Sequence, residues 1–275
     1  MPSPLALSPS RALDYLQCPL KYRLGAIDKI PQEPKEHLVK GNLVHAVLEK
    51  LHQLPRADRT FPAAVKLIKP TYAEMLAKDS GIEHAIDDED VFFNDCRDLV
   101  RGYFRMENPG GFDCDATEKY FEEILPSRVP VRGFIDRVDT APTGEVRVVD
   151  YKTGKKPHPR YSFNAYFQMR FYALVYWRTT GRVPDLLRLM YLKVLDDLVL
   201  SPSPEELEAF ERDLAELWEK IVADGRSGRF RPKTSKLCDW CDYRELCPEF
   251  GGVPPEYPGW PGSTADHSTH QNLAK

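Results

Sequence analysis

The chain has 275 residues, of which 42% are hydrophobic, and its formal net charge at pH 7 is −4. This size allows one large domain or two modest ones with a buried core, and the weak negative charge is atypical of a protein whose whole surface binds nucleic acid. The sequence contains no apolar run of about eighteen residues and no basic start followed by an apolar stretch, so we expect no membrane span, no secretory signal and a cytoplasmic location.

The N-terminal part of the chain is predicted to be helical. Ser8 is a favourable N-cap and Pro9 suits the first helical position, so a helix should begin here and carry Cys18 at its far end. Residues 41–54 have the pattern of an amphipathic helix, and His45 lies in its second turn.

Helical periodicity continues over residues 61–106. We expect interruptions at Pro70 and around Ser80, because proline lacks a donor N–H and clashes with the preceding helical turn. The N-terminal helices together predict a helical layer over about residues 8–110.

From Glu118 the hydrophobic period changes to two, which is typical of strands. Three strands are expected, at residues 118–125, 130–138 and 145–152. Thr143-Gly144 supplies a reversal between the last two strands, which we therefore interpret as a hairpin.

The second half of the chain alternates helices and strands. Residues 163–177 predict a helix that is apolar on nearly all sides, yet Gln168 and Tyr172 lie one turn apart on the same face. A strand over 186–194 with a short return follows, and then Ser203 begins a capping box that opens another helix.

This order of elements predicts the α/β class, with a mixed central sheet flanked by helices and a core over about residues 115–222. Residues 251–275 are rich in proline, glycine and serine with little apolar pattern, and we expect them to form a disordered tail.

The predicted hairpin brings two acids and a lysine together. Asp136 lies on its first strand, and Asp150 and Lys152 share one face of its second strand, while Tyr151 points to the other face. A divalent cation such as Mg²⁺ prefers carboxylate oxygens, and a neighbouring ammonium group can orient or deprotonate a water, which is the chemistry of phosphodiester cleavage. The alternative is that the acids cap a turn and that Asp150 and Lys152 form an ordinary ion pair facing solvent.

Four of the six cysteines form a candidate ligand set, because three of them are closely spaced near the C-terminus and clustered thiols in a reducing compartment are typical metal ligands. Four thiolates suit either a structural zinc ion or an iron–sulfur cluster, and the spacing does not choose between them. We interpret Cys96 and Cys114 as packing residues. The candidate ligands are Cys18, Cys238, Cys241 and Cys247.

Motifs that cover most of the chain share an order and a spacing with a known family. They are Leu7–Ser10, Cys18–Tyr22, Gly41–His45, Gly133–Asp136, Val149–Gly154, Gln168–Tyr172 and the three C-terminal cysteines. With these motifs the chain resembles PD-(D/E)XK nucleases of the RecB type, in particular the branch with an iron–sulfur staple found in AddB-like and CRISPR-associated adaptation nucleases. The resemblance implies a single nuclease domain over residues 1–250 with a restriction-endonuclease-like core and a staple between Cys18 and residues 238–247.

The resemblance also implies roles for individual residues. Lys152 would position or activate the attacking water, and Gln168 and Tyr172 would contact DNA or support the site. Glu118 matches an upstream acid of the family, although Glu122 fits as well. The four cysteines would hold a [4Fe-4S] cluster. The implied ligands of Mg²⁺ or Mn²⁺ are His45, Asp136, Asp150 and the main-chain carbonyl of Tyr151.

These expectations combine into a metal-dependent DNA nuclease, an exonuclease that acts on DNA ends or single strands in repair or recombination. Two basic runs, over residues 152–160 and 226–236, are either contacts for a nucleic-acid backbone or solvated loops. The chain has no phosphate-binding G-x-x-x-x-G-K-[ST] loop, so a helicase motor would be a separate partner. The alternatives are a catalytically degenerate iron–sulfur module that binds nucleic acid in a repair complex and, less favoured, an electron-transfer protein.

Overall fold

The structure, a computed structural model, describes residues 5–261 and contains a five-stranded sheet. Neighbouring strands in the sheet have the same order as in the sequence, β1-β2-β3-β4-β5. β2 is antiparallel to β3, β3 is parallel to β4, and β4 is antiparallel to β5. The α/β class with a mixed sheet flanked by helices is thus confirmed. The strands are β1 (Ala116–Ile124), β2 (Pro130–Thr140), β3 (Val146–Lys152), β4 (Leu186–Tyr191) and β5 (Asp196–Leu200).

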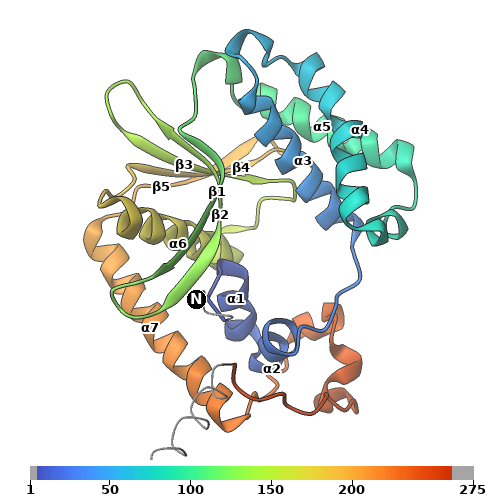
Figure 1. Cartoon of the computed structure of the whole chain (residues 1–275), viewed down its shortest axis with the longest axis vertical. Helices are drawn as coiled ribbons and strands as arrows, with labels where there is room; N and C mark the ends of the chain where they lie inside the picture. The colour runs from blue at the N-terminus through green and yellow to red at the C-terminus, as the bar shows by residue number, and fades with distance from the viewer. Residues whose placement is uncertain (1–4, 262–275) are drawn as a thin grey trace, which may run out of the picture. The chain divides into compact units, whose positions relative to one another are not determined.

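Helices precede, interrupt and follow this sheet in the chain (Figure 1). The first begins where the sequence predicts, because the Ser8 hydroxyl accepts a hydrogen bond from the N–H of Arg11 and Pro9 occupies the first turn. None of the helices within residues 5–261 is both long and apolar enough to cross a membrane. The α-helices are α1 (Pro9–Gln17), α2 (Pro19–Tyr22), α3 (Glu36–Gln53), α4 (Phe61–Lys78), α5 (Glu89–Met106), α6 (Phe163–Thr180) and α7 (Pro204–Ser227).

The chain divides into two compact units, each of which is described by itself. The second unit comprises Glu33–Phe121 and Gly133–Phe210, and it contains α3 to α6 and most of the sheet. The first unit takes in the residues up to Gln32, then Glu122–Arg132 and the residues from Glu211 onward. The strands β1 and β2 and the helix α7 contribute residues to both units.

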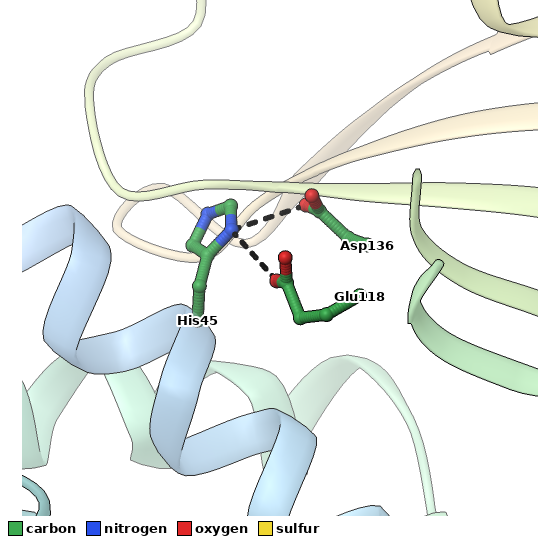
Figure 2. Close-up of side chains that lie close together, drawn as sticks. All are labelled: His45, Glu118 and Asp136. Carbon is green, nitrogen blue, oxygen red and sulfur yellow. Dashed lines mark ion pairs between the residues drawn. The ribbon is translucent and has the colours of Figure 1, made fainter. Parts of the chain in front are cut away.

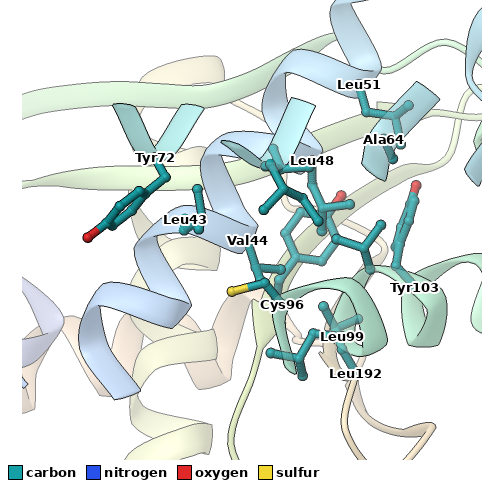
Figure 3. Packing of buried hydrophobic residues seen from close by; sticks show 14 of the residues in the cluster. Leu43, Val44, Leu48, Leu51, Ala64, Tyr72, Cys96, Leu99, Tyr103 and Leu192 are labelled. Atoms are coloured by element: carbon teal, nitrogen blue, oxygen red, sulfur yellow. The ribbon is translucent and has the colours of Figure 1, made fainter. Parts of the chain in front are cut away.

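An apolar core joins α3, α4 and α5 to one face of the sheet in the second unit (Figure 3). Leu43 and Leu48 of α3 are fully buried, and they pack in the same cluster as Val149 and Tyr151 of β3. Cys96 of α5 is also fully buried in this core, as expected of a packing residue. The core therefore fixes α3, the helix that carries His45, against the end of β3.

The expected break at Pro70 does not occur, and α4 runs without interruption from Phe61 to Lys78. Proline removes one helical hydrogen bond, which leaves the carbonyl of Lys66 without its helical partner, and both Lys66 and Pro70 are exposed, so water can reach that carbonyl. Burial of the neighbouring Ile68 and Tyr72 in the core holds the helix together across that point. The predicted break near Ser80 is present as a short 3-10 helix, Ser80–Ala85.

The hairpin between β2 and β3 forms as predicted. Thr140 pairs with Val146, Arg137 pairs with Val149, and Gly144 takes a φ of 101° in the turn, a backbone conformation that suits glycine. After β3 the chain crosses through α6 to the parallel strand β4, as parallel neighbours require.

The first unit contains the N-terminal helices, part of α7 and the C-terminal cysteines. In it the hydroxyl of Tyr15 donates a hydrogen bond of 2.7 Å to Asp224. Of the segment expected to be a disordered tail, residues 262–275 lie outside the described residues. Residues 251–261 pack instead: the hydroxyl of Tyr257 donates to the carbonyl of Gly225, and the ring of Trp260 lies 6.2 Å from that of Trp218. Two aromatic side chains thus anchor a segment whose composition suggests disorder.

Candidate functional site

The hairpin places Asp136 and Asp150 next to each other on one face of the sheet. Each lies one step beyond the last registered pair, Arg137 with Val149, so the two strands separate at this point. Both carboxylates are buried, with 8% and 3% of the residue exposed. The N–H of Tyr151 donates a hydrogen bond of 2.8 Å to Oδ2 of Asp136, which ties the first acid to the strand that carries the second.

His45 points from α3 toward two acidic side chains (Figure 2). Its Nδ1 lies 3.3 Å from Oδ2 of Asp136 and 3.8 Å from Oε1 of Glu118. Its Nε2 lies 2.8 Å from the carbonyl oxygen of Tyr151. Both ring nitrogens thus face oxygen acceptors, an arrangement that suits the doubly protonated imidazolium.

Lys152 is held by two partners at the end of β3. Its Nζ lies 2.7 Å from Oδ2 of Asp150 and donates a hydrogen bond of 2.8 Å to Oε1 of Gln168 on α6. The Gln168 amide in turn donates to Oδ1 of Asp150 at 2.8 Å and to the hydroxyl of Tyr172 at 3.0 Å. The glutamine therefore fixes the lysine and the carboxylate relative to each other.

A second polar network lies on the opposite face of the same two strands. Arg137 is fully buried, and its guanidinium donates to the hydroxyls of Tyr151 and Tyr103 and pairs with Asp139 and Glu107. Such a buried cation is tolerated only because several oxygens surround it. Sequence reasoning did not identify this residue, although its place beside Asp136 in an alternating strand directs it to the opposite face.

Mutual repulsion and attraction among the site residues perturb their proton affinities. Burial alone would lower the pKa of His45, but the charge of Asp136, followed by those of Asp150 and Glu118, raises it to about 9. Burial and then the charge of Asp136 raise the pKa of Glu118 to about 7. Burial raises the pKa of Asp150 to about 6, against the opposing attraction of Lys152. Burial would raise the pKa of Asp136 too, but the imidazolium of His45 holds it below its usual range.

The donor set at this site fits a hard divalent cation. One ligand atom each from His45, Glu118 and Asp136 lies within 4.8 Å of the other two, and the carbonyl of Tyr151 is a further oxygen beside the imidazole. Carboxylate and carbonyl oxygens are the ligands that Mg²⁺ and Mn²⁺ prefer. Burial is the main cause of the raised pKa values of Glu118 and Asp150, and the charge of Asp136 adds to it; a bound cation would stabilise the ionised form of both carboxylates.

Most of the residues predicted from the sequence therefore meet in one place. Glu118 rather than Glu122 is the upstream acid that reaches His45. Asp150 is not a member of the compact three-residue group; its oxygens are engaged by Lys152 and Gln168. The residues that come together are His45, Glu118, Asp136, Asp150, Tyr151, Lys152, Gln168 and Tyr172.

The four candidate cysteine ligands line one small pocket of about 30 Å³ in the first unit. The N–H of Lys233 lies 3.4 Å from Sγ of Cys18, and the N–H of Ser235 lies 3.3 Å from Sγ of Cys238; both donate toward sulfur. Within residues 5–261, no cysteines belong to a metal-ligand group with all its atoms within 4.8 Å. The sulfurs thus share a pocket without forming a compact group.

Known proteins resemble the chain over most of its length. The sequence profile of the PD-(D/E)XK nuclease superfamily matches residues 6–248. The Gene 69 proteins of Mycobacterium phages D29 and L5 are 28% and 27% identical to the chain, and each match covers 88% of this chain and 96% of the phage protein. The crystal structure of a candidate exonuclease from Eubacterium rectale has the same fold, with a TM-score of 0.57 at 11% identity over 87% of this chain and 88% of that one.

Proposed function

The chain belongs to the PD-(D/E)XK nuclease superfamily, and from this premise we propose that it is a metal-dependent deoxyribonuclease that acts as an exonuclease on DNA ends or single strands. The observation that carries the proposal is the meeting of Asp136, Asp150 and Lys152 around one position, with His45 beside them. The Eubacterium rectale protein of the same fold is named as a candidate exonuclease, which supports the choice of reaction.

His45, once its ligating nitrogen has given up its proton, would hold Mg²⁺ or Mn²⁺ with Asp136 and the carbonyl of Tyr151, together with Asp150 and Glu118. Such a cation, when bound, lowers the pKa of a water and stabilises the negative charge on phosphoryl oxygens. The contact of the Tyr151 N–H with Asp136 holds one carboxylate in place for this purpose. The hydrogen bond between His45 and the Tyr151 carbonyl holds two further candidate metal ligands next to each other.

Lys152 would act on the attacking water or on the charge that develops at phosphorus. Its ammonium group is partly exposed, with 28% of the side chain accessible, so it can reach a substrate while Asp150 and Gln168 hold it. Tyr172 completes this arrangement because its buried hydroxyl accepts from Gln168. The roles of Gln168 and Tyr172 are therefore to position the lysine.

Exposed basic residues beside the site support a nucleic-acid substrate despite the net negative charge. Lys155, His158 and Arg160 lie on the surface of the segment that follows Lys152. Lys155 also lines a pocket of about 500 Å³, which Lys40 and Lys193 share with Asp95 and Asp98, so the basic surface is confined to the exposed segment itself. A local basic surface of this kind attracts phosphates without a basic protein overall.

We further propose that the four cysteines hold a [4Fe-4S] cluster. A tetrahedral zinc ion with Zn–S bonds of about 2.3 Å requires sulfurs about 3.8 Å apart, whereas a cluster with four irons holds its thiolates farther from one another. All four thiols line one pocket of the first unit, which supports a shared ligand, and the resemblance of the cysteine motifs to the iron–sulfur branch favours the cluster. The two N–H groups that donate toward sulfur suit thiolates that carry charge.

The activity is tested with end-labelled single-stranded, double-stranded and closed circular DNA in Mg²⁺ or Mn²⁺. We expect shortening of linear substrates and little cutting of circles, because an exonuclease needs an end. Asp136→Asn and Lys152→Ala should reduce cleavage by about 100-fold or more, and Asp213→Asn, which changes an exposed aspartate on α7, should leave it unchanged. Binding of DNA without cleavage in either metal would support a degenerate nucleic-acid-binding module instead. The proposed role in repair or recombination, with a helicase as a separate partner protein, depends on this cleavage activity.

A further inference from the structure

Two aromatic side chains of the second unit are exposed side by side on neighbouring strands. Tyr120 of β1 is 49% exposed and Phe134 of β2 is 51% exposed. Their ring centroids lie 5.0 Å apart, with an angle of 50° between the ring planes. Large aromatic rings at half exposure are costly to leave in water, so a pair in contact on a sheet surface indicates a binding role.

Packing on the other side of the strands fixes the outward direction of this pair. Phe121 and Ile135, the residues that follow them in the chain, are buried at 6% and 3% exposure. A Cβ atom at Gly133 would lie 2.9 Å from the ring of Phe121, so this ring packs directly on the glycine backbone and fixes β1 against β2. Because side chains alternate along a strand, Tyr120 and Phe134 must point away from the buried side.

The pair is adjacent to the candidate active site along both strands. Phe134 precedes Asp136 by two residues, and Tyr120 follows Glu118 by two residues. Two residues of a strand span about 7 Å, a distance that the sugar and base of a nucleotide next to the reacting phosphate can bridge.

We propose that Tyr120 and Phe134 form a stacking platform for an unpaired nucleobase next to the reacting phosphate, and that this platform gives the site a preference for single strands over duplex. The inference rests on the proposed nuclease function. Aromatic side chains stack on any base, whereas the bases of a duplex already stack on one another and are shielded within it. The platform therefore selects for unpaired bases without selecting for a sequence.

The test pairs the removal of the aromatic rings with the removal of the bases. Fluorescence anisotropy in EDTA measures the affinity of the wild type and of Tyr120→Ala/Phe134→Ala for three probes: a poly-thymidylate strand, the same strand with abasic sites, and a duplex. Val199→Ala is a matched control, because Val199 is a 49% exposed apolar residue on the opposite edge strand, β5. Thermal unfolding of each variant verifies the fold, and Phe134→Trp keeps a stacking surface.

The double variant should bind the normal strand about 5- to 100-fold more weakly than the wild type does. It should bind the abasic strand and the duplex as the wild type does, and Phe134→Trp should retain the affinity of the wild type. A loss of equal size on all three probes would refute stacking, as would unchanged affinity for the normal strand. A change in oligomeric state or thermal stability without that selective loss would assign the pair to a protein contact and overturn the proposal. Cleavage of linear DNA by the wild type with Mg²⁺ or Mn²⁺ separates the two hypotheses. If neither metal supports cleavage, the proposed nuclease function is refuted; if cleavage occurs, the binding data test the stacking platform alone.

Discussion

The guanidinium of Arg137 donates a hydrogen bond of 2.7 Å from Nη1 to the hydroxyl of Tyr151. The same tyrosine presents its main-chain carbonyl to His45 at 2.8 Å and donates its N–H to Asp136. The buried cation thus anchors the side chain of a residue whose backbone organises the candidate metal site. Stability and site geometry are coupled through one residue of β3.

Replacing Arg137 with methionine should strongly destabilise the fold. The carboxylates of Glu107 and Asp139 would lose a fully buried partner, and breaking such a pair typically costs about 3–5 kcal/mol. Chemical denaturation gives the free energy of unfolding. Arg101→Met, which removes an exposed pair with Asp98, is the control and should change the free energy by less than about 1 kcal/mol. Equal effects of the two substitutions would contradict the importance of the buried network.

Substitutions of Lys152 and Gln168 should affect cleavage to different degrees. Lys152→Ala removes the ammonium group and should reduce the cleavage rate by about 100-fold or more. Gln168→Leu keeps the lysine but removes its positioning bond, for which we expect a loss of about 10- to 100-fold. Single-turnover assays at saturating DNA measure both rates, and Lys220→Ala on α7 is the control. A Gln168→Leu enzyme with the full rate would show that the glutamine positions nothing.

The affinity for a divalent cation should depend on Glu118 and not on Glu122. Glu118 lies 3.8 Å from the imidazole of His45, and both glutamates are on β1. Glu118→Gln should weaken binding of Mn²⁺ about 10-fold or more, because it removes a charged oxygen ligand. Isothermal titration calorimetry without DNA provides the measurement, and Glu122→Gln is the matched control. If the control weakens binding and Glu118→Gln does not, the upstream acid has been misassigned.

His52 should make the fold sensitive to acid. Burial, followed by the charges of Arg137 and Arg59, lowers the pKa of this side chain from 6.5 to about 3. Because the unfolded chain takes up the proton more readily than the folded one, stability falls as the pH drops below 6.5 and continues to fall toward 3.

The acid effect is measured by comparing the wild type with His52→Gln. The glutamine can still accept from the hydroxyl of Tyr103 but does not titrate. From pH 7 to about pH 5 the wild type should lose about 2 kcal/mol more than the variant, as urea unfolding reports. Parallel losses in the two proteins would show that His52 does not carry the effect.

Loss of one cysteine of the pocket should release the proposed cluster. Cys18→Ala should lose the brown colour of an anaerobically purified protein and unfold at a lower temperature, because metal binding contributes to folding. Cys114→Ala is the control, since Cys114 does not line the pocket. Iron analysis and visible spectroscopy follow the cluster. A colourless wild type that contains zinc, or a thermal transition that is unchanged after cluster removal, would contradict this prediction.

The sequence alone predicts those parts of the molecule that depend on local patterns. A period of two, with Thr143-Gly144 between two strands, is enough to define the hairpin, and Asp136 and Asp150 each lie one residue beyond its last registered pair, Arg137 with Val149. The alternation also places Lys152 on the same face as Asp150, where the two are 2.7 Å apart. Short-range geometry therefore gives the centre of the site.

The remaining features depend on contacts between distant residues, which single-sequence patterns do not encode. Arg137 is charged and gives no sign of burial until Glu107, thirty residues earlier, is brought to it by α5. Glu118 takes a φ of 43°, an unusual conformation for a residue with a side chain, so strand alternation does not give its direction. Pro70 lies within a helix because the core around it outweighs its local preference.

Contacts at both ends fix the position of the segment between β3 and α6. Lys152 pairs with Tyr191 in the parallel ladder and bonds to Gln168 on the far side of the connection. The exposed residues 158–161 can therefore be exchanged or recharged while the reactive groups stay in place, whereas Lys156 pairs with Asp196 and the buried Ser162 is the N-cap residue of α6. For protein engineering, the connection is therefore a site where a loop that binds a different nucleic-acid structure can be inserted while the candidate catalytic residues are unchanged.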